Sequence, residues 1–252
     1  MTTIEAIGLK WARRISLAFI AWSEQEQKSR NIEIKPFDPT PLIEGAFYEA
    51  GAAQIGEIGK LIGMGVKFDL RSIEAEAWIK KYSAEQIKYI SKTNQLAIRQ
   101  IKLRAFQEGL SIGEQRQLIK QFVGLLPQHV IAVGNYQDGL MRTGMDNESA
   151  ERLVAKYRTK LLNYRSKNIA VTEGMTATNE GVRKTNENAV KRGVVDPDEW
   201  EQEWIVTGLK NVCNKCQSAN GTRAPIGGTF PNGSRGPPIH QSDHCNAVLV
   251  RK

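Results

Sequence analysis

The chain has 252 residues, of which 40% are hydrophobic and 25% are charged, a composition typical of a globular protein with one large core or two smaller domains. The longest apolar run, Ile15–Trp22, falls far short of the ~20 residues that cross a bilayer, so the sequence predicts no membrane-spanning segment and no membrane partner. The formal net charge of +8 favours polyanionic partners, nucleic acid above all, and says nothing about specificity.

Residues 1–67 are predicted to be an N-terminal docking segment, amphipathic at first and then rich in glycine and alanine. Near its start, Ile15, Phe19 and Trp22 recur at helical spacing. Residues 42–66 contain six glycines, each of which costs a helix about 1 kcal/mol relative to alanine. We therefore expect this second part to be helical only where another surface packs closely on it, either a partner protein or the chain's own core.

Residues 68–167 are predicted to form a helical domain. Ser72 is placed to cap a long helix. Ser111 and Glu114 have the spacing of a capping box, which predicts the start of a second helix. Pro127 stands at a tolerated early position of a third helix. These signals predict several helices in series.

A further helical pattern runs to Gly193, as one long helix or a broken pair, and its first part is strongly basic. Six basic residues and no acid fall between positions 152 and 167. Such a run is either a solvated helix face or a surface that faces a polyanion. In the second case, the candidates for facing nucleic acid are Arg152, Lys156, Arg158, Lys160, Arg165 and Lys167.

After Gly193 the pattern changes to that of a small module with β-structure. The stretch that begins at Glu199 predicts a short strand leading to a Cys-x-x-Cys knuckle, and glycine and proline dominate from Gly221 onward. The expected fold class is a mainly α-helical body with a small C-terminal α+β module, residues 168–252, stapled by zinc.

The zinc prediction comes from the three cysteines, which all lie in the last 40 residues. Cys213 and Cys216 can turn both thiolates toward one tetrahedral Zn²⁺, and Cys245 can supply a third. The fourth ligand is expected to be His240, which leaves four residues for the chain to turn back to Cys245, with His244 as the alternative. The Gly/Pro-rich sequence between the two halves has few apolar residues, and modules of this kind take their folding energy from a structural metal.

Other uses of these residues fit the pattern less well. A redox Cys-x-x-Cys belongs in a βαβ context, whereas helices precede this one and a Gly/Pro loop follows it. A deaminase zinc site needs a Glu two residues after a ligand His, and Ser242 and Asn246 occupy those positions. Loop cysteines without any metal are a further alternative.

An alternative function for the chain is a basic zinc-containing nuclease or DNA-processing enzyme. Such an enzyme needs a general base or a metal with an open coordination position. Asp243 is one of the acids nearest to the knuckle that could serve.

Three stretches, in order, resemble the phage Mu F-like minor head proteins, also called the MuF or head morphogenesis domain. They are residues 168–194 (NIAVTEGMTATNEGVRKTNENAVKRGV), 204–216 (WIVTGLKNVCNKC) and 236–245 (GPPIHQSDHC). With weaker matches upstream, the resemblance spans about residue 68 to the end of the chain. Among its departures, the chain has Asp243 and His244 where the family has cysteine and arginine, which removes one candidate thiolate.

The resemblance implies a structural, non-enzymatic minor capsid protein of a tailed bacteriophage. Such a protein is bound at the portal vertex inside the head, in multiple copies, and supports head morphogenesis and DNA packaging or ejection. The implied partners are the portal protein, the major capsid or scaffold protein, and packaged DNA held by non-specific electrostatics. The implied location is the interior of the virion head, after assembly in the host cytoplasm.

Overall fold

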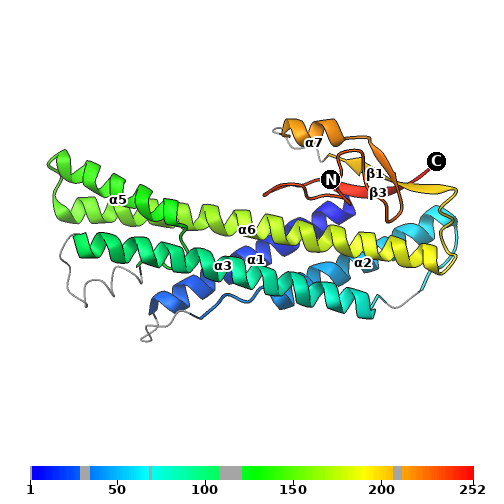
Figure 1. Cartoon of the computed structure of the whole chain (residues 1–252), viewed down its shortest axis with the longest axis horizontal. Helices are drawn as coiled ribbons and strands as arrows, with labels where there is room; N and C mark the ends of the chain where they lie inside the picture. The colour runs from blue at the N-terminus through cyan, green and yellow to red at the C-terminus, as the bar shows by residue number, and fades with distance from the viewer. Residues whose placement is uncertain (1, 29–34, 68–69, 108–120, 207–211) are drawn as a thin grey trace. The chain divides into compact units, whose positions relative to one another are not determined.

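The computed structural model describes residues 2–28, 35–67, 70–107, 121–206 and 212–252, without the side chains of residues 102–107. Most of these residues are helical, and a three-stranded sheet lies near the C-terminal end of the chain (Figure 1). The predicted fold class, a mainly helical body with a small C-terminal α+β module, is therefore confirmed. The elements are α1 (Thr3–Lys28), α2 (Thr40–Ile62), α3 (Ile73–Gln107), α5 (Pro127–Arg142), α6 (Asn147–Lys191), β1 (Trp200–Ile205), α7 (Asn214–Ala219), β2 (Arg223–Pro225) and β3 (Asn246–Arg251).

Local signals determine where several helices begin and end. The Oγ of Ser72 accepts a hydrogen bond of 3.1 Å from the backbone N–H three residues later, as expected of a helix cap. Pro127 is the first residue of α5. The basic pattern belongs to one unbroken helix of 45 residues, α6, which is followed by Gly193 at φ 67°. The capping box predicted at Ser111 and Glu114 lies outside the described residues.

The chain divides into two compact units, each assembled from separate stretches. Unit 1 comprises Met1–Ile15, Pro39–Ser83 and Asn168–Lys252, and unit 2 comprises Ser16–Asp38 and Ala84–Lys167. Helices α1, α3 and α6 contribute residues to both units. The two units are thus interleaved along the chain. The division into consecutive segments 1–67, 68–167 and 168–252, expected from the sequence, stays a prediction.

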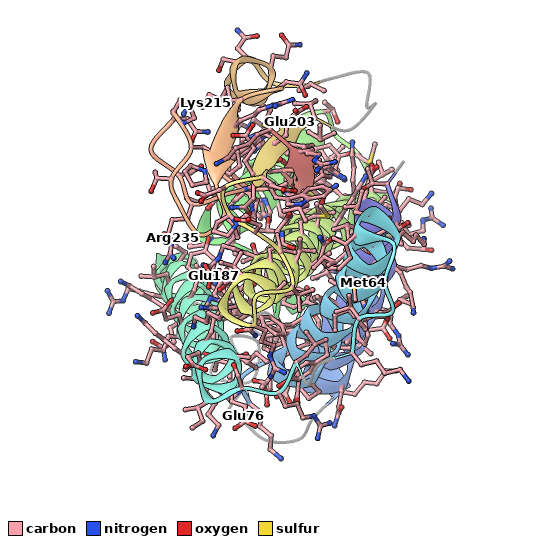
Figure 2. All side chains as sticks on the ribbon, turned by 90° about the vertical axis from the view of Figure 1, so that its right-hand side faces the viewer. Met64, Glu76, Glu187, Glu203, Lys215 and Arg235 are labelled. Carbon is pink, nitrogen blue, oxygen red and sulfur yellow. The ribbon has the colours of Figure 1, made fainter. Side chains whose placement is uncertain are left out.

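In unit 1, the sheet has the strand order β2-β1-β3, and both pairings are antiparallel. Alternate residues of β1 are buried, so Trp204 points inward and packs edge-on against Phe230, with ring centroids 5.2 Å apart. Figure 2 labels Glu203 of β1 and Lys215 of α7 in this module. Glu203 is half-buried on the opposite face and forms an ion pair of 2.9 Å with Arg223 of β2. The Gly/Pro-rich end of the chain is therefore a folded module with its own core.

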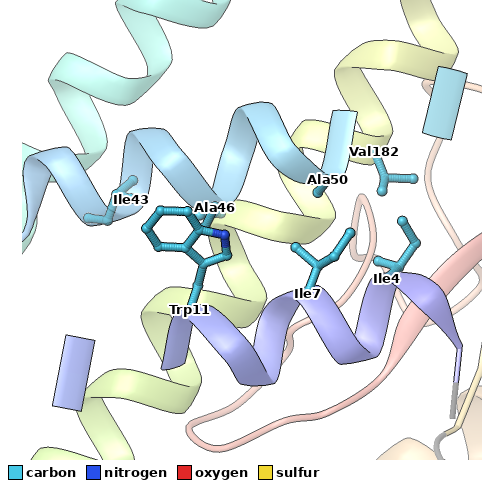
Figure 3. Packing of buried hydrophobic residues seen from close by; sticks show 8 residues of the cluster. Ile4, Ile7, Trp11, Ile43, Ala46, Ala50 and Val182 are labelled. Atoms are coloured by element: carbon cyan, nitrogen blue, oxygen red, sulfur yellow. The ribbon is translucent and has the colours of Figure 1, made fainter. Parts of the chain in front are cut away.

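The helical core of unit 1 is formed by the first half of α1, by α2 and by the second half of α6 (Figure 3). Its side chains come from distant parts of the sequence, because α1 is the first helix of the chain and α6 is the last one before the sheet. Each buried Ile or Val of this kind contributes roughly 1.5–3 kcal/mol to folding. The buried members are Ile4, Ile7, Trp11, Ile43, Ala46, Ala50, Ala177 and Val182.

This packing explains several glycines where the helices approach closely. A Cβ at Gly45 would lie 2.2 Å from the indole ring of Trp11, so only glycine lets α1 approach so closely. On the facing helix, a Cβ at Gly181 would lie 2.2 Å from the carbonyl oxygen of Phe47. At Gly45 and Gly51 the surface that packs closely on α2 is therefore the chain's own core, whereas a Cβ at Gly56, Gly63 or Gly65 would meet nothing within 4 Å.

Unit 2 has a separate core in which α3, α5 and α6 meet the segment after residue 121. Its buried members are Ala97, Ile101, Phe122, Leu125, Val130, Val133 and Val154. The buried hydroxyl of Ser23 donates a 2.9 Å hydrogen bond to the carbonyl of Val123, which ties α1 to that segment. Across the described helices, none combines the length and the hydropathy of a bilayer-spanning segment.

Candidate functional site

The Cys-x-x-Cys knuckle is formed by the entry into α7. Cys213 has an extended backbone (φ −71°, ψ 155°) and caps the helix, because its Sγ accepts a 3.4 Å hydrogen bond from the backbone N–H of Cys216. This turn brings the two sulfur atoms to the same side of the knuckle. Cys213 is exposed and Cys216 is buried, so the pair lies at the edge of the module's core.

The imidazole of His240 lies between these two cysteines. Its Nε2 is 3.1 Å from Sγ of Cys213 and 3.0 Å from Sγ of Cys216. Its Nδ1 lies 2.8 Å from the carbonyl oxygen of Gln241, which places the ring proton on Nδ1. The lone pair of Nε2 therefore faces the two sulfurs, in the tautomer that a metal-binding histidine needs.

Cys245 and Asp243 extend the same cluster. The donor atoms of Cys213, Cys216 and His240 all lie within 4.8 Å of one another, and so do those of Cys216, Asp243 and Cys245. Cys216 belongs to both sets and joins them. His244, the alternative ligand in the sequence, belongs to neither set. The structure thus brings together three cysteines, one histidine and one carboxylate that are up to 32 residues apart in sequence (Cys213 to Cys245).

Asp243 holds the loop in shape. One of its carboxylate oxygens accepts a hydrogen bond of 2.9 Å from the N–H of Ile239, and the other accepts one of 2.8 Å from the N–H of Cys245. The carboxylate therefore pins the backbone on both sides of the turn that carries His240 and Cys245. The sequence offered Asp243 as a missing thiolate or as an acid for the nuclease alternative, and nothing local to residue 243 reveals which amides it meets.

The donor atoms of Cys213, Cys216 and His240 have the spacing of three ligands of a tetrahedral metal ion, and Cys245 adjoins this set through Cys216. Zinc with Zn–S near 2.3 Å and Zn–N near 2.0 Å holds sulfur and nitrogen donors about 3.5 Å apart. The observed separations of 3.1 and 3.0 Å reach that value through small side-chain movements. Three sulfurs and one imidazole nitrogen are soft and borderline donors of the kind that select zinc over calcium or magnesium. The cluster is therefore a plausible metal-binding site.

The pKa values of the thiols differ because their surroundings differ. The N–H of Cys216 and the imidazole of His240 lower the pKa of the exposed Cys213 thiol below its ordinary value. Burial raises the pKa of Cys216 to about 12, and burial also raises the pKa of Cys245. Two of the three sulfurs therefore need a cation beside them to become thiolates at neutral pH.

The loop that carries His240 and Cys245 is fastened to helix α6. The N–H of Ser242 donates to Oγ1 of Thr172 at 3.1 Å, and the amide of Asn179 donates to the carbonyl of Cys245 at 3.1 Å. In each pair, one partner lies in the stretch 168–194 and the other in the stretch 236–245, two of the three that resemble the MuF family. Two stretches that the sequence related only by their order along the chain are thus in direct contact in the fold.

The basic run on α6, in unit 2, is only partly a surface. Arg165 is 3% exposed, and its guanidinium donates to the side chain of Asn94 at 2.9 Å and to the carbonyl of Gly124 at 2.6 Å. The prediction that Arg165 faces nucleic acid is therefore wrong, because its guanidinium is buried and forms hydrogen bonds within unit 2. Arg158 is half-buried, with its guanidinium over the ring of Phe122.

The remaining basic candidates are exposed, and they share one face of the helix. They are spaced by four, four and seven residues, and at 100° per residue these steps return to nearly the same side. The four are Arg152, Lys156, Lys160 and Lys167, which we call the basic stripe. Within it, Arg152 lies 3.5 Å from Glu148, an exposed pair one turn apart.

Comparison of the chain with protein families, with characterised proteins and with solved structures finds no match. The interpretation of the site therefore depends on the chemistry of the donor atoms and on the contacts between the motif-bearing stretches. Both are properties of unit 1 alone.

Proposed function

We propose that this chain is a minor head protein of a tailed bacteriophage, bound at the portal vertex inside the head, with a structural rather than an enzymatic role. The observation that supports the proposal is the contact between stretches 168–194 and 236–245, made through Thr172, Ser242, Asn179 and Cys245. Both stretches lie in one compact unit, so the motifs that carry the resemblance belong to a single folded module. Their contact is what a shared domain fold requires.

The metal centre is proposed to be a structural zinc site with Cys213, Cys216, His240 and Cys245 as ligands. Four protein ligands fill a tetrahedral zinc ion and leave no position for water or substrate, which is the pattern of structural rather than catalytic zinc. When bound, the ion would hold the knuckle at α7 to the loop before β3. Asp243, which already accepts two backbone hydrogen bonds, is assigned to bracing this loop.

The basic stripe is proposed to lie against packaged DNA. Four exposed cations on one helix face suit the regular phosphates of a duplex, and such contacts need no base recognition. Because each contact releases condensed counterions, the binding would be strongly salt-dependent and non-specific in sequence. The portal protein and the major capsid or scaffold protein are the proposed protein partners.

The function is tested on particles made by the genome that encodes this chain. We expect mass spectrometry to find the chain in purified heads, and antibody labelling to place it at a single vertex. Deleting the gene should lower the yield of DNA-filled heads. Normal yield and normal DNA content without the chain, together with its absence from purified heads, would overturn the proposal.

A direct assay separates this proposal from the nuclease alternative. Supercoiled plasmid is incubated with the purified zinc-loaded chain and Mg²⁺ or Mn²⁺, and the products are resolved by gel electrophoresis. We expect the plasmid to stay supercoiled. Nicking that co-elutes with the chain and stops with EDTA would favour an enzyme.

A further inference from the structure

Unit 1 contains a cavity of about 190 Å³ where α3, α6, the sheet and the Gly-Pro-Pro loop meet. Its lining residues come from five separate parts of the chain, so no single stretch of sequence reveals it. The volume is below the ~300–1,000 Å³ of sites that enclose a drug-sized ligand, so it has room for one ring system and not for a whole large ligand.

One side of the cavity is aromatic. Trp78 and Tyr82, one turn apart on α3, are stacked with their rings 4.9 Å apart and nearly parallel, at 9°. Phe47 of α2 stacks on Trp78 in turn, at 5.5 Å. Pro237, which is buried, and Pro238 also line the cavity. Flat aromatic and proline surfaces of this kind favour a planar ring over a branched aliphatic group.

The interior of the cavity also has two buried amide side chains. Asn179 is 6% exposed; its Nδ2 donates to the carbonyls of Met175 and Cys245, while its Oδ1 has no partner among the described residues. Gln202 of β1 is 1% exposed, and its Nε2 donates to the carbonyl of Pro225. A buried acceptor without a donor costs about 1–3 kcal/mol, which a ligand with an N–H group would recover.

The charges at the cavity leave a positive excess. Arg183 forms ion pairs with Glu180 and Glu187, and Lys184 also pairs with Glu187. Arg235, beside Glu187 in Figure 2, adds a third cation whose side chain is 65% exposed and 3.6 Å from that carboxylate. Of the charged residues that line the cavity itself, Arg183 and Arg235 are cations and Glu180 is a carboxylate, so the lining has a positive excess of one charge.

We propose that this cavity binds a nucleotide, with the base against Trp78 and Tyr82 and the phosphate at Arg235. The rings supply stacking, the amide of Asn179 supplies an acceptor for a base N–H, and Arg235 supplies a charge-assisted donor. An apolar ligand would leave the amides and Arg235 unused, and a free phosphate would leave the rings unused. The nucleotide has two sources, a free mononucleotide or the unpaired end of a DNA strand.

The test is calorimetric titration of the full chain with four probes: dAMP, deoxyadenosine, a blunt 12-base-pair duplex, and that duplex with a one-nucleotide 3′ overhang. We expect saturable binding of dAMP, or of the overhang duplex in preference to the blunt one, and each result identifies its source. Arg235→Gln should weaken dAMP or overhang binding about tenfold and leave deoxyadenosine unchanged. Arg251→Gln is the matched control, because Arg251 is also an exposed, ion-paired arginine of unit 1 and does not line the cavity.

A second readout needs no variant. Intermolecular nuclear Overhauser effects from the bound base to indole and phenol protons report contact of the base with the stacked pair of Trp78 and Tyr82 directly. Equal binding of blunt and overhang duplexes without dAMP binding would overturn the proposal. So would inorganic phosphate that binds as tightly as dAMP. Neither result bears on whether the chain is part of a phage head, which the particle experiment decides separately.

Discussion

The Sγ of Cys216 lies 3.0 Å from Nε2 of His240, although 24 residues separate them in sequence. This contact brings together the two ends of the Gly/Pro-rich loop between residues 216 and 240, so the loop forms a closed ring. Within the loop the buried apolar side chains are mostly small, with Phe230 the large one, so the closure of the ring should depend strongly on whatever holds these two donors together. The first two predictions follow from this.

Purified chain should contain about one zinc ion, and Cys216→Ser should lose it. Without the metal, the module after residue 199 should become sensitive to protease, because its small core is expected to need the ion to hold the knuckle and the loop before β3 together. Helix content should change little, because α1, α2 and α6 have a separate core. Metal analysis, limited proteolysis and circular dichroism measure the three effects. Ser218→Ala, an exposed change on α7, is the control, and a variant that keeps its zinc would contradict the ligand set.

His240 and His244 should respond differently to substitution. His240→Ala removes an imidazole 3.1 and 3.0 Å from two sulfurs, and we expect zinc affinity to fall at least about 100-fold. His244→Ala should leave the stoichiometry at one, because His244 belongs to neither donor set. Competition with a chromophoric chelator gives both affinities. Equal losses in the two variants would show that the assignment is wrong.

Glu173 should make unit 1 less stable as the pH rises. Burial raises the pKa of Glu173 from 4.5 to about 7, and a hydrogen bond from Tyr82 only partly opposes this. Between pH 4.5 and 7 the folded state therefore holds a proton that the unfolded state has lost, so stability falls across this window and levels off above it. Glu173→Gln should gain roughly 2–3 kcal/mol over the wild type between pH 5 and pH 8.

Urea unfolding followed by circular dichroism at the two pH values measures this difference. Glu44→Gln, an exposed change on α2, is the control and should show no such gain. A Glu173→Gln variant whose stability tracks the wild type at both pH values would rule out the linkage.

Arg165 should matter for stability. Its guanidinium donates to Thr93, Asn94 and Gly124, and Arg165→Met would remove the donor from the half-buried Thr93 and from the buried Asn94 and Gly124. We expect a loss of roughly 2–4 kcal/mol in the free energy of unfolding. The exposed Lys160→Met serves as comparison and should stay within about 0.5 kcal/mol of the wild type. Two variants of equal stability would contradict the buried network.

The basic stripe should control the salt dependence of DNA binding. Replacing Lys156, Lys160 and Lys167 together by Gln should lower the slope of log K against log salt by about 0.9 for each DNA phosphate that the chain no longer neutralises. The weakening should be equal for unrelated duplex sequences, because phosphate contacts carry no base information. Fluorescence anisotropy at several salt concentrations measures the slope. An unchanged slope would remove DNA from the proposed partners of this face.

Local signals were enough to predict much of the fold. The cap at Ser72, the glycine after α6 and the Cys-x-x-Cys knuckle each act over a few residues, and the structure has all three. The donors Cys213, Cys216 and Cys245 were also accessible, because few residue types bind zinc and the chain has few of them.

Tertiary contacts decided what local signals could not. Arg165 looks like its exposed neighbours in sequence, and only the approach of residues 93, 94 and 124 buries it. Glu173 looks like an ordinary polar residue of a long helix until α3 covers it. Asp243 gains its role from two amides on either side of a turn whose shape the sequence does not specify.

The interleaving of unit 1 has a consequence for how the chain acquires its structure. The side chain of Asn246 donates to Oγ1 of Thr2 across a sequence separation of 244 residues. During synthesis, Ile4, Ile7 and Trp11 must therefore wait for Ala177 and Val182 before their core can close. Such non-local contacts make folding slow and leave apolar surface exposed in the interim. Fragments that lack either end should aggregate, so attempts to dissect this protein will need to keep both.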